Sequence, residues 1–269
     1  MVIDFHTHIF PEKIAAMAIA SLEKTSGMTA FGDGTLKGKN GLVNNMQNGG
    51  ADLSVVLPVA TNTKQVRSVN DYIISVKDTP GIIAFGGIHP DFPECKDEIK
   101  RIKENGLKGI KIHPDFVRYF ADDNQMVYAV KCAAEEGLPV LLHGGVDVSF
   151  PEYVHCTPER LLRLSQKVPD AVIICAHLCG YTHWDELKRY MWEFADRNVY
   201  FDISTVLSVP KKRGLTEILN LCNPNNILFG TDFPWFDQSE EIKKLEMLNI
   251  SPEFKEKIKH LNAERLLGI

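Results

Sequence analysis

Eight short apolar segments along the chain have the length and composition of buried β-strands, and helix-like segments separate them. Parallel strands need helical crossovers, so this alternation predicts an α/β protein with a parallel sheet. Eight strand–helix pairs within 269 residues predict one (β/α)8 TIM barrel. The predicted strands are residues 1–5, 52–59, 81–88, 107–113, 139–143, 171–177, 199–203 and 227–232.

A doubly wound open sheet is the alternative fold. Such a sheet normally carries a glycine-rich turn after its first strand, whereas residues 6–8 here are His-Thr-His. No Pro/Gly/Ser-rich linker separates the segments, so we expect a single domain over residues 1–269. The predicted helices are residues 11–24, 42–48, 62–77, 94–104, 124–136, 157–167, 184–197, 210–222, 239–248, 252–259 and 262–267.

The first predicted helix and the segment after it help to place the site. Ile14, Met17, Ala18 and Leu22 recur at helical spacing and predict one apolar face. Residues 25–40 are rich in Gly, Thr and Lys and are predicted to form a loop near the mouth of the site.

Charge and composition exclude several classes of protein. The net charge is −5 with basic residues dispersed among acids, so a nucleic-acid surface is not expected. No apolar run approaches the roughly 20 residues that a membrane span needs. The N-terminus has no basic region before an apolar stretch, so no signal peptide is expected. Six cysteines in a chain of this length are typical of a reducing cytoplasm, which is the expected location.

His6 and His8 follow the first predicted strand at a spacing of two residues. Residues two apart on a strand point to the same face, so both imidazoles leave the end of a buried strand side by side. Two ring nitrogens placed in this way can bind one divalent metal ion. A pair of this kind also occurs as a plain polar strand end, so the interpretation depends on further ligands.

Polar residues at the ends of the other predicted strands supply candidate ligands. The active site of a barrel is built at the carboxyl ends of its strands, so their shared position carries more weight than any single residue. These residues are His89, Lys111, His113, His143, His177 and Asp232.

Several of these residues could have roles other than binding a metal in the active site. His143 could be a buried core histidine, although Gly144 and Gly145 after it leave room for a ligand. Asp232 could cap the next helix, but a buried carboxylate needs a cation, which a metal supplies. His177 lies in Cys-Ala-His-Leu-Cys at 175–179, which could be a thiolate site. We interpret those cysteines instead as small buried apolar residues.

Lys111 and His113 share one face of the fourth predicted strand because they too are two residues apart. Lys111 could be a buried structural lysine, could bind a substrate carboxylate, or could be carbamylated and bridge two metals. We expect His113 to contact substrate. We expect Trp235, with Phe233 and Phe236, to wall the pocket.

The constellation of His6, His8, His143, His177 and Asp232 resembles the amidohydrolase superfamily. The finer resemblance is to its amidohydrolase-related branch, which includes aminocarboxymuconate-semialdehyde decarboxylase. Because the matching segments span both ends of the chain, the resemblance covers essentially all of it; it is specific for fold and poor at naming a substrate. These segments are Ile-Asp-Phe-His-Thr-His-Ile-Phe-Pro at 3–11, Gly-Ile-Lys-Ile-His-Pro at 109–114, Gly-Thr-Asp-Phe-Pro-Trp at 230–235 and Asn-Ala-Glu-Arg-Leu-Leu-Gly at 262–268.

The resemblance implies a barrel of the metal-dependent hydrolase type. His6, His8, His143 and Asp232 would hold one divalent metal ion, usually zinc, and His177 would orient water or a substrate oxygen. In binuclear members a second metal is bound through His177 and a carboxylated lysine, here Lys111. The branch commonly does not use that lysine, so one metal is favoured. A homodimer is also implied.

The first predicted reaction is hydrolysis of an amide, lactone or ester bond in a small polar molecule. A metal such as zinc lowers the pKa of bound water to about 7, and Asp232 would take its proton and pass it to the leaving group.

The alternative is metal-dependent non-oxidative decarboxylation of a small unsaturated or aromatic acid. A structural or sensor metal protein is disfavoured, because a structural site needs no carboxylate base and no spare histidine. The expected partner is a small-molecule substrate, with no nucleic acid and no membrane.

Overall fold

A computed structural model describes residues 1–180, 184–208 and 214–269. The chain divides into two compact units, each assembled from more than one stretch of sequence. The first unit comprises residues Met1–Val56, Pro80–Ile82 and Asp202–Ile269. The second comprises Leu57–Thr79 and Ile83–Phe201. No helix among the described residues combines the length and the apolar character needed to cross a bilayer.

In the first unit, β1 (Ile3–Thr7) is buried along its whole length and pairs in parallel with β2 (Leu53–Val56). The other edge of β1 is bonded to the segment that follows β9 (Ile227–Leu228), since Phe5 N donates to Phe229 O at 2.8 Å. The helices of this unit are α1 (Glu12–Ser26), α2 (Leu42–Gly49), α9 (Leu215–Leu221), α10 (Gln238–Glu246), α11 (Pro252–Glu256) and α12 (Asn262–Leu267), with a π-helical turn at Lys257–Leu261.

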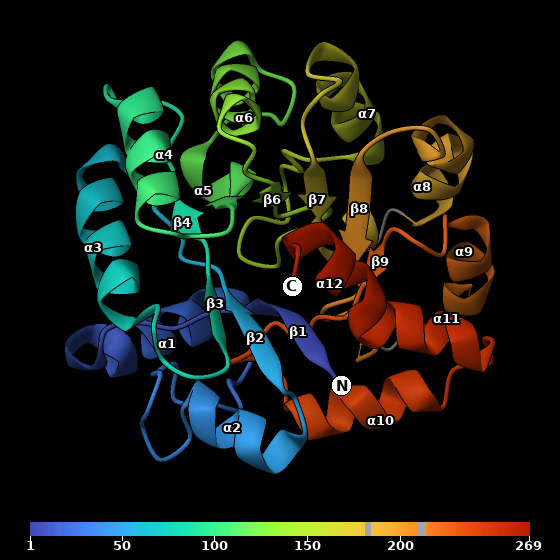
Figure 1. Ribbon diagram of the computed structural model, residues 1–269, viewed down its shortest axis with the longest axis horizontal. Coiled ribbons are helices and arrows are strands. Elements are labelled where there is room, and N and C mark those ends of the chain that lie inside the picture. Colours follow the sequence, from blue (N-terminus) through green and yellow to red (C-terminus); the bar gives the residue numbers. More distant parts are fainter. Residues whose placement is uncertain (181–183, 209–213) are drawn as a thin grey trace. The chain divides into compact units, whose positions relative to one another are not determined.

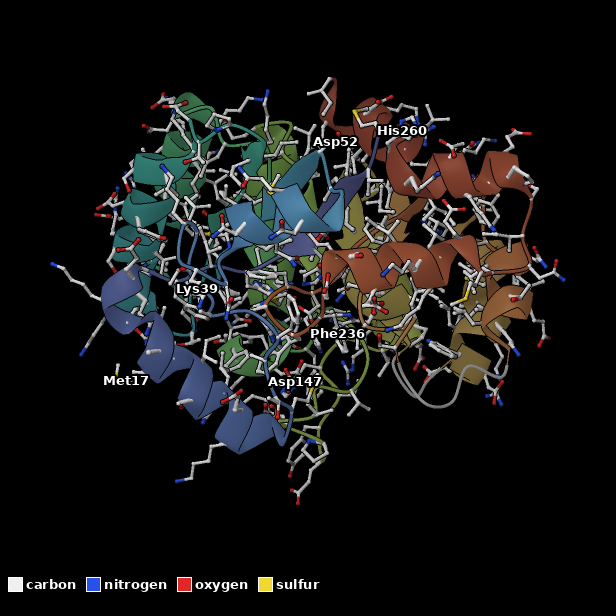
Figure 2. The ribbon with its side chains drawn as sticks, turned by 90° about the horizontal axis from the view of Figure 1, so that it is seen from below. Met17, Lys39, Asp52, Asp147, Phe236 and His260 are labelled. Carbon is white, nitrogen blue, oxygen red and sulfur yellow. The ribbon has the colours of Figure 1, made fainter. Side chains whose placement is uncertain are left out.

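The apolar face expected for the first helix is not the face that α1 buries. Ile14 is 43% and Met17 is 71% exposed, and Met17 projects outward from the helix (Figure 2). The buried residues are Ala15 and Ile19. Ile19 packs against Gly34, where an added Cβ would lie 2.8 Å from Ile19 Cδ1. The loop at residues 25–40 therefore covers a face of the helix that is turned away from the one that the spacing suggested, and Ala18 and Leu22 are half-buried.

In the second unit, parallel strands β4 (Gly86–Gly87), β5 (Ile110–Ile112), β6 (Val140–Leu142), β7 (Ile173–Cys175) and β8 (Val199–Asp202) are neighbours in that order, and β6, β7 and β8 lie side by side in Figure 1. Asp202, the last residue of β8, belongs to the first unit. The remaining elements are η1 (Thr63–Gln65), α3 (Val66–Val76), α4 (Cys95–Glu104), α5 (Pro114–Val117), α6 (Asn124–Glu135), α7 (Pro158–Lys167), η2 (Ala176–Cys179), α8 (Trp184–Tyr190) and η3 (Met191–Phe194).

The register of this sheet places polar residues together at one edge. Ile112, Leu142 and Cys175 form one row across β5, β6 and β7. The residues directly after the first two are His113 and His143. Because the strands are parallel, these side chains emerge at the same carboxyl edge. Full burial of all three strands agrees with their continuous apolar sequences.

The structure contains the predicted strands and helices, but several of them begin or end at other residues. The third predicted strand is interrupted, giving β3 (Ile82–Ala84) and β4. The sixth predicted strand ends at Cys175 instead of His177. Thr157 caps α7 as the sequence indicates, accepting a hydrogen bond from Arg160 N. The helix predicted at residues 210–222 falls partly on residues 209–213, which lie outside the described residues, and its remainder is α9.

Candidate metal centre

His6, His8 and Asp232 converge in the first unit. Their candidate ligand atoms all lie within 4.8 Å of one another. Nε2 of His6 and Nε2 of His8 are 3.1 Å apart. Oδ1 of Asp232 lies 3.6 Å from His6 Nε2 and 3.3 Å from His8 Nε2. The sequence predicted that these three residues would be neighbours, and the structure brings them together.

Backbone pairing beside β1 places Asp232 next to the two histidines. Asp232 N donates to His6 O at 2.8 Å, and His8 N donates to Phe233 O at 2.7 Å. Gly230 permits this approach, because a Cβ at that position would lie 2.9 Å from His6 Cβ. Asp232 itself adopts φ 67°, a left-handed conformation that is costly for a residue other than glycine. Such strain at a polar residue is typical of functional sites.

Asp202 is the partner of His6 that the sequence analysis did not identify. His6 Nδ1 donates to Asp202 Oδ2 at 2.8 Å, and Ser204 Oγ lies 3.1 Å from the same nitrogen. Asp202 and Ser204 are both fully buried. A carboxylate on Nδ1 fixes the tautomer that leaves Nε2 with a lone pair, as is usual for a histidine that binds metal. The available sequence signal was a single aspartate in the last two residues of the strand predicted at residues 199–203.

The second carboxylate oxygen of Asp232 has its own partner. Thr205 Oγ1 donates to Asp232 Oδ2 at 3.1 Å. This contact leaves Oδ1 as the oxygen that faces the two imidazoles. Asp232 is 15% and His8 is 16% exposed, whereas His6 is buried. The cluster is therefore closed around His6 and accessible beside His8 and Asp232.

This donor set fits a divalent transition metal ion. Two imidazole nitrogens and one carboxylate oxygen are ligands of zinc, manganese, iron and cobalt sites in proteins. The Asp202 contact supplies the outer hydrogen bond that such sites use to orient a ligand. Three protein ligands with one accessible side match an open catalytic site better than a closed structural one.

His143 belongs to a second cluster of histidines, in the second unit. Its Nδ1 lies 3.2 Å from His177 Nε2, and its ring stacks on the His113 ring with centroids 4.2 Å apart. His113 Nε2 lies 3.2 Å from Asp147 Oδ2. His143 Nε2 is buried and has no hydrogen-bond partner among the described residues. A buried imidazole nitrogen of this kind is available to a ligand.

Burial holds the pKa of His143 well below its usual value, and the neighbouring His113, His177 and Lys111 lower it further. The charge of Asp147 raises the pKa of His143. A shift of the pKa in this direction favours the neutral imidazole, which is the form that binds metal. The resemblance assigns His143 to the same ion as His6, and that assignment stays a prediction.

The other predicted site residues are placed as follows. His177 lies beyond the end of β7, in a left-handed turn with φ 58°, so the prediction that it ends a strand was wrong. Lys111 is buried on β5. Trp235 is half-buried, and its backbone N donates to Asp232 O at 2.9 Å. Substrate contacts by Lys111, His113 and Trp235 stay predictions.

His155, which the sequence analysis did not single out, has a specific partner. Its Nδ1 lies 2.8 Å from Oδ1 of the buried Asp115, whose second oxygen is 3.8 Å from His113 Nδ1. Burial raises the pKa of Asp115 to about 6 although the contact with His155 lowers it. Asp115 thus links His155 to the histidine cluster, a relationship that the sequence did not indicate.

Comparisons with known proteins agree with the fold and with the family resemblance. A family model described as amidohydrolase matches residues 3–269. An uncharacterized TIM-barrel protein from Bordetella bronchiseptica has a TM-score of 0.80 at 20% identity, covering 99% of this chain and 98% of that one. The predicted (β/α)8 barrel is thereby confirmed. A search among curated proteins found no match.

Two further similar structures are decarboxylases. The 2,6-dihydroxybenzoate decarboxylase from Rhizobium has a TM-score of 0.72 at 16% identity, covering 99% of this chain and 98% of that one. The 5-carboxyvanillate decarboxylase from Novosphingobium aromaticivorans, solved with manganese and a nitrobenzoic acid, has a TM-score of 0.75 at 14% identity, covering 100% and 96%. At these identities the likeness shows the fold of this chain, while the reactions and the manganese are properties of those two proteins.

Proposed function

Because the chain belongs to the amidohydrolase family, we propose that it is a metal-dependent decarboxylase of a small aromatic or unsaturated carboxylic acid. The observation that carries this proposal is the cluster of His6, His8 and Asp232, backed by Asp202 and accessible on one side. The whole-length likeness to decarboxylases of hydroxylated aromatic acids supports the choice of reaction.

His6, His8 and Asp232 would hold one divalent metal ion, with His143 as the fourth ligand that the resemblance implies. When bound, such an ion supplies a Lewis acid that holds substrate oxygens and stabilises negative charge that develops in the reaction. Manganese is the metal named in a similar structure, and zinc suits the same nitrogen and oxygen donors. We also propose, from the family resemblance, that the substrate is a small molecule and that the protein forms a homodimer.

The reaction breaks the bond between a ring carbon and the carboxylate. Carbon dioxide leaves, the electron pair stays on the carbon, and that carbon must then receive a proton. This proton comes from a water molecule, and we assign its transfer to Asp232, whose Oδ1 faces the cluster while Thr205 holds Oδ2; the hydroxide left behind balances the step. His177 would orient a substrate oxygen.

Hydrolysis of a small amide, lactone or ester is the second candidate. The family model supports it at the level of the family, and the same three residues would serve it. The two reactions differ in what they release, since decarboxylation yields carbon dioxide and hydrolysis yields an acid.

The test is a parallel assay of the metal-loaded protein. Hydroxybenzoic acids are screened for carbon dioxide release, and lactones, esters and amides are screened for acid release, with manganese or zinc. Carbon dioxide from an aromatic acid is the expected result. The Asp232→Asn variant should lose about 10²–10⁴-fold in rate. Asp97→Asn, at an exposed position on α4, is the control and should keep full activity.

Acid release without carbon dioxide would overturn decarboxylation and favour hydrolysis. Full activity in Asp232→Asn, with metal content unchanged, would exclude Asp232 as the proton carrier in either reaction.

A further inference from the structure

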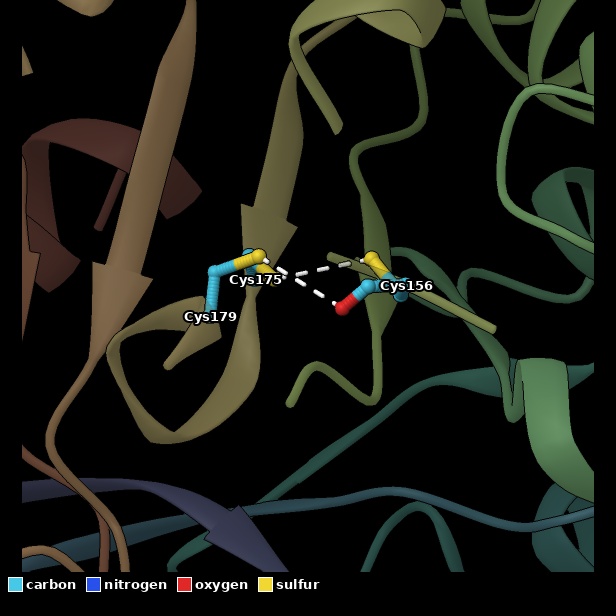
Figure 3. A group of neighbouring side chains, drawn as sticks. All are labelled: Cys156, Cys175 and Cys179. Carbon is cyan, nitrogen blue, oxygen red and sulfur yellow. Dashed lines mark hydrogen bonds between the residues drawn. The ribbon is translucent and has the colours of Figure 1, made fainter. Parts of the chain in front are cut away.

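Three cysteines converge inside the second unit, although the chain carries them on separate segments. Cys156 precedes α7, Cys175 ends β7 and Cys179 ends η2, and their side chains face one another (Figure 3). Their sulfur atoms all lie within 4.8 Å of one another, and Cys156 Sγ and Cys175 Sγ are 3.9 Å apart. Each residue is fully buried.

The distance between the sulfur atoms of Cys156 and Cys175 matches the separation of two thiolates bound to one metal ion. With a zinc–sulfur bond of about 2.3 Å, two thiolates lie about 3.8 Å apart in a tetrahedral site and about 4.0 Å apart in a trigonal one. The Cys156–Cys175 distance of 3.9 Å falls in this range. A disulfide would need the two sulfur atoms at about 2.05 Å, and all three cysteines are free thiols.

The backbone bends sharply to bring Cys179 back toward Cys175. His177, Leu178 and Cys179 have φ of 58°, 55° and 46°, so three consecutive residues other than glycine are left-handed. Each such residue costs roughly 1–2 kcal/mol. Strain of this size persists where the surroundings over-determine it, and it clusters at functional sites. A small buried thiol that only fills space would not require this turn.

Gly144, two residues beyond the end of β6, makes room for the cluster. A Cβ at this position would lie 2.3 Å from Cys175 Sγ and 3.0 Å from Cys179 Cα. Hydrogen bonds from the Cys175 and Cys179 thiols lower the pKa of Cys156 below its ordinary value, although its burial acts in the opposite direction. Cys156 faces the sulfur atoms of Cys175 and Cys179, so the three donors are already gathered around one point.

We propose that Cys156, Cys175 and Cys179 bind one thiophilic divalent ion of the zinc class, at a site separate from the His6–His8–Asp232 cluster. Soft thiolates select zinc and related ions over manganese or magnesium. Three thiolates carry a charge of −3, so a divalent ion leaves −1 buried and a monovalent ion would leave −2. Because buried net charge is costly, the divalent ion is favoured.

This site would stabilise the turn that carries His177. His177 stands between Cys175 and Cys179 in sequence, and its Nε2 lies 3.2 Å from His143 Nδ1. An ion that joins both cysteines would oppose unfolding of the strained turn. The inference rests on the thiol cluster and the turn that forms it, and it holds whichever reaction the protein catalyses.

The test uses cadmium as a spectroscopic substitute for zinc. The full-length chain is produced and purified with Cd²⁺ present, so that the ion is available while the buried cluster forms. Bound thiolates give an ultraviolet sulfur-to-cadmium charge-transfer band that histidine and carboxylate ligands do not give. We expect one thiolate-bound cadmium per chain, with a band that disappears on acidification because the thiolates take up protons.

Two variants separate this cluster from the other cysteines. Cys179→Ala should weaken cadmium binding at the thiol site at least about 100-fold, since even an outer-shell substitution costs about 10–100-fold. Cys222→Ala is the control, because Cys222 is also buried but bonds to Ile218 O in the first unit. It should keep the band unchanged. If Cys179→Ala fails to fold, Cys156→Ser serves in its place.

Absence of the charge-transfer band in the folded wild-type protein would overturn the proposal. An equal band in Cys179→Ala would do the same. A chain whose mass is lower by two hydrogens, with cadmium absent, would show an oxidised pair instead of a metal site. Loss of the band in Cys222→Ala alone would place the thiolate elsewhere.

Discussion

Asp202 accepts a hydrogen bond of 2.8 Å from Nδ1 of His6, and both side chains are buried. The contact holds the His6 ring with Nε2 toward His8 and Asp232. The orientation of the candidate metal ligand is therefore set by a residue almost two hundred positions away in the sequence. A carboxylate on the outer nitrogen also makes the inner nitrogen a stronger donor.

Replacing Asp202 by Asn should weaken metal binding without removing a ligand. The amide can no longer balance the imidazole N–H with a negative charge, so we expect about a 10–100-fold loss of affinity for manganese or zinc. Titration of the metal-free protein measures the change. Asp52→Asn, at an exposed position, is the control. Wild-type affinity in Asp202→Asn would contradict the assigned role.

Gly144→Ala should destabilise the protein and disturb the thiol cluster. Its Cβ would collide with Cys175 Sγ and with the backbone of Cys179, so we expect a loss of about 1–3 kcal/mol. Gly106→Ala is the comparison, because Gly106 has open space around it and only a left-handed φ of 80°. That variant should cost about 1 kcal/mol, because a residue with a Cβ is strained at a left-handed φ. Urea unfolding of both variants measures the loss in the free energy of unfolding. Equal losses in the two variants would contradict the expected collision.

Glu98→Gln should be far more damaging than Glu94→Gln. Glu98 is fully buried and lies 2.8 Å from both Arg67 and Arg101, while Asn70 donates to it at 2.7 Å. Removing a buried partner of an ion pair costs about 3–5 kcal/mol, reduced here because the arginines are partly exposed.

Glu94 bonds the same Arg67 at 2.7 Å but is 60% exposed, so its loss should cost less than about 1 kcal/mol. Thermal unfolding of the two variants compares their losses of stability. A similar fall in melting temperature would mean that burial does not determine the strength of this network.

Asp122 should contribute stability that is lost in acid. Burial alone would raise its pKa, but a hydrogen bond from Arg160 and the charges of Arg160 and Arg163 lower the pKa below its ordinary value. The folded state then binds fewer protons than the unfolded state near the ordinary pKa. Its contribution is therefore present above that value and is lost as pH falls through the lowered pKa of the folded state.

We expect Asp122→Asn to lose up to about 1 kcal/mol at pH 7, since the pair is partly solvated, and to lose less relative to wild type below pH 3. Chemical unfolding at both pH values measures the change. Asp170→Asn, at an exposed position, serves as the control. An equal difference at both pH values would contradict the assignment.

The sequence was sufficient to predict the barrel and the neighbourhood of His6, His8 and Asp232. Strand and helix periodicity are local properties, and parallel strands present their carboxyl ends at one edge, so residues at strand ends gather there without further information. Thr157 before Pro158 indicated the start of α7 for the same local reason.

Other features were decided only by the tertiary structure. The buried face of α1 depends on Gly34 reaching Ile19, which helical spacing alone cannot reveal. In the sequence Asp202 looks like any other strand residue. Only the folded structure places the end of its strand beside His6. Cys156 lies on a different segment from Cys175 and Cys179, and the left-handed turn through His177 aims the last sulfur inward. Each is a contact between distant segments, fixed by packing and backbone geometry that no local pattern encodes.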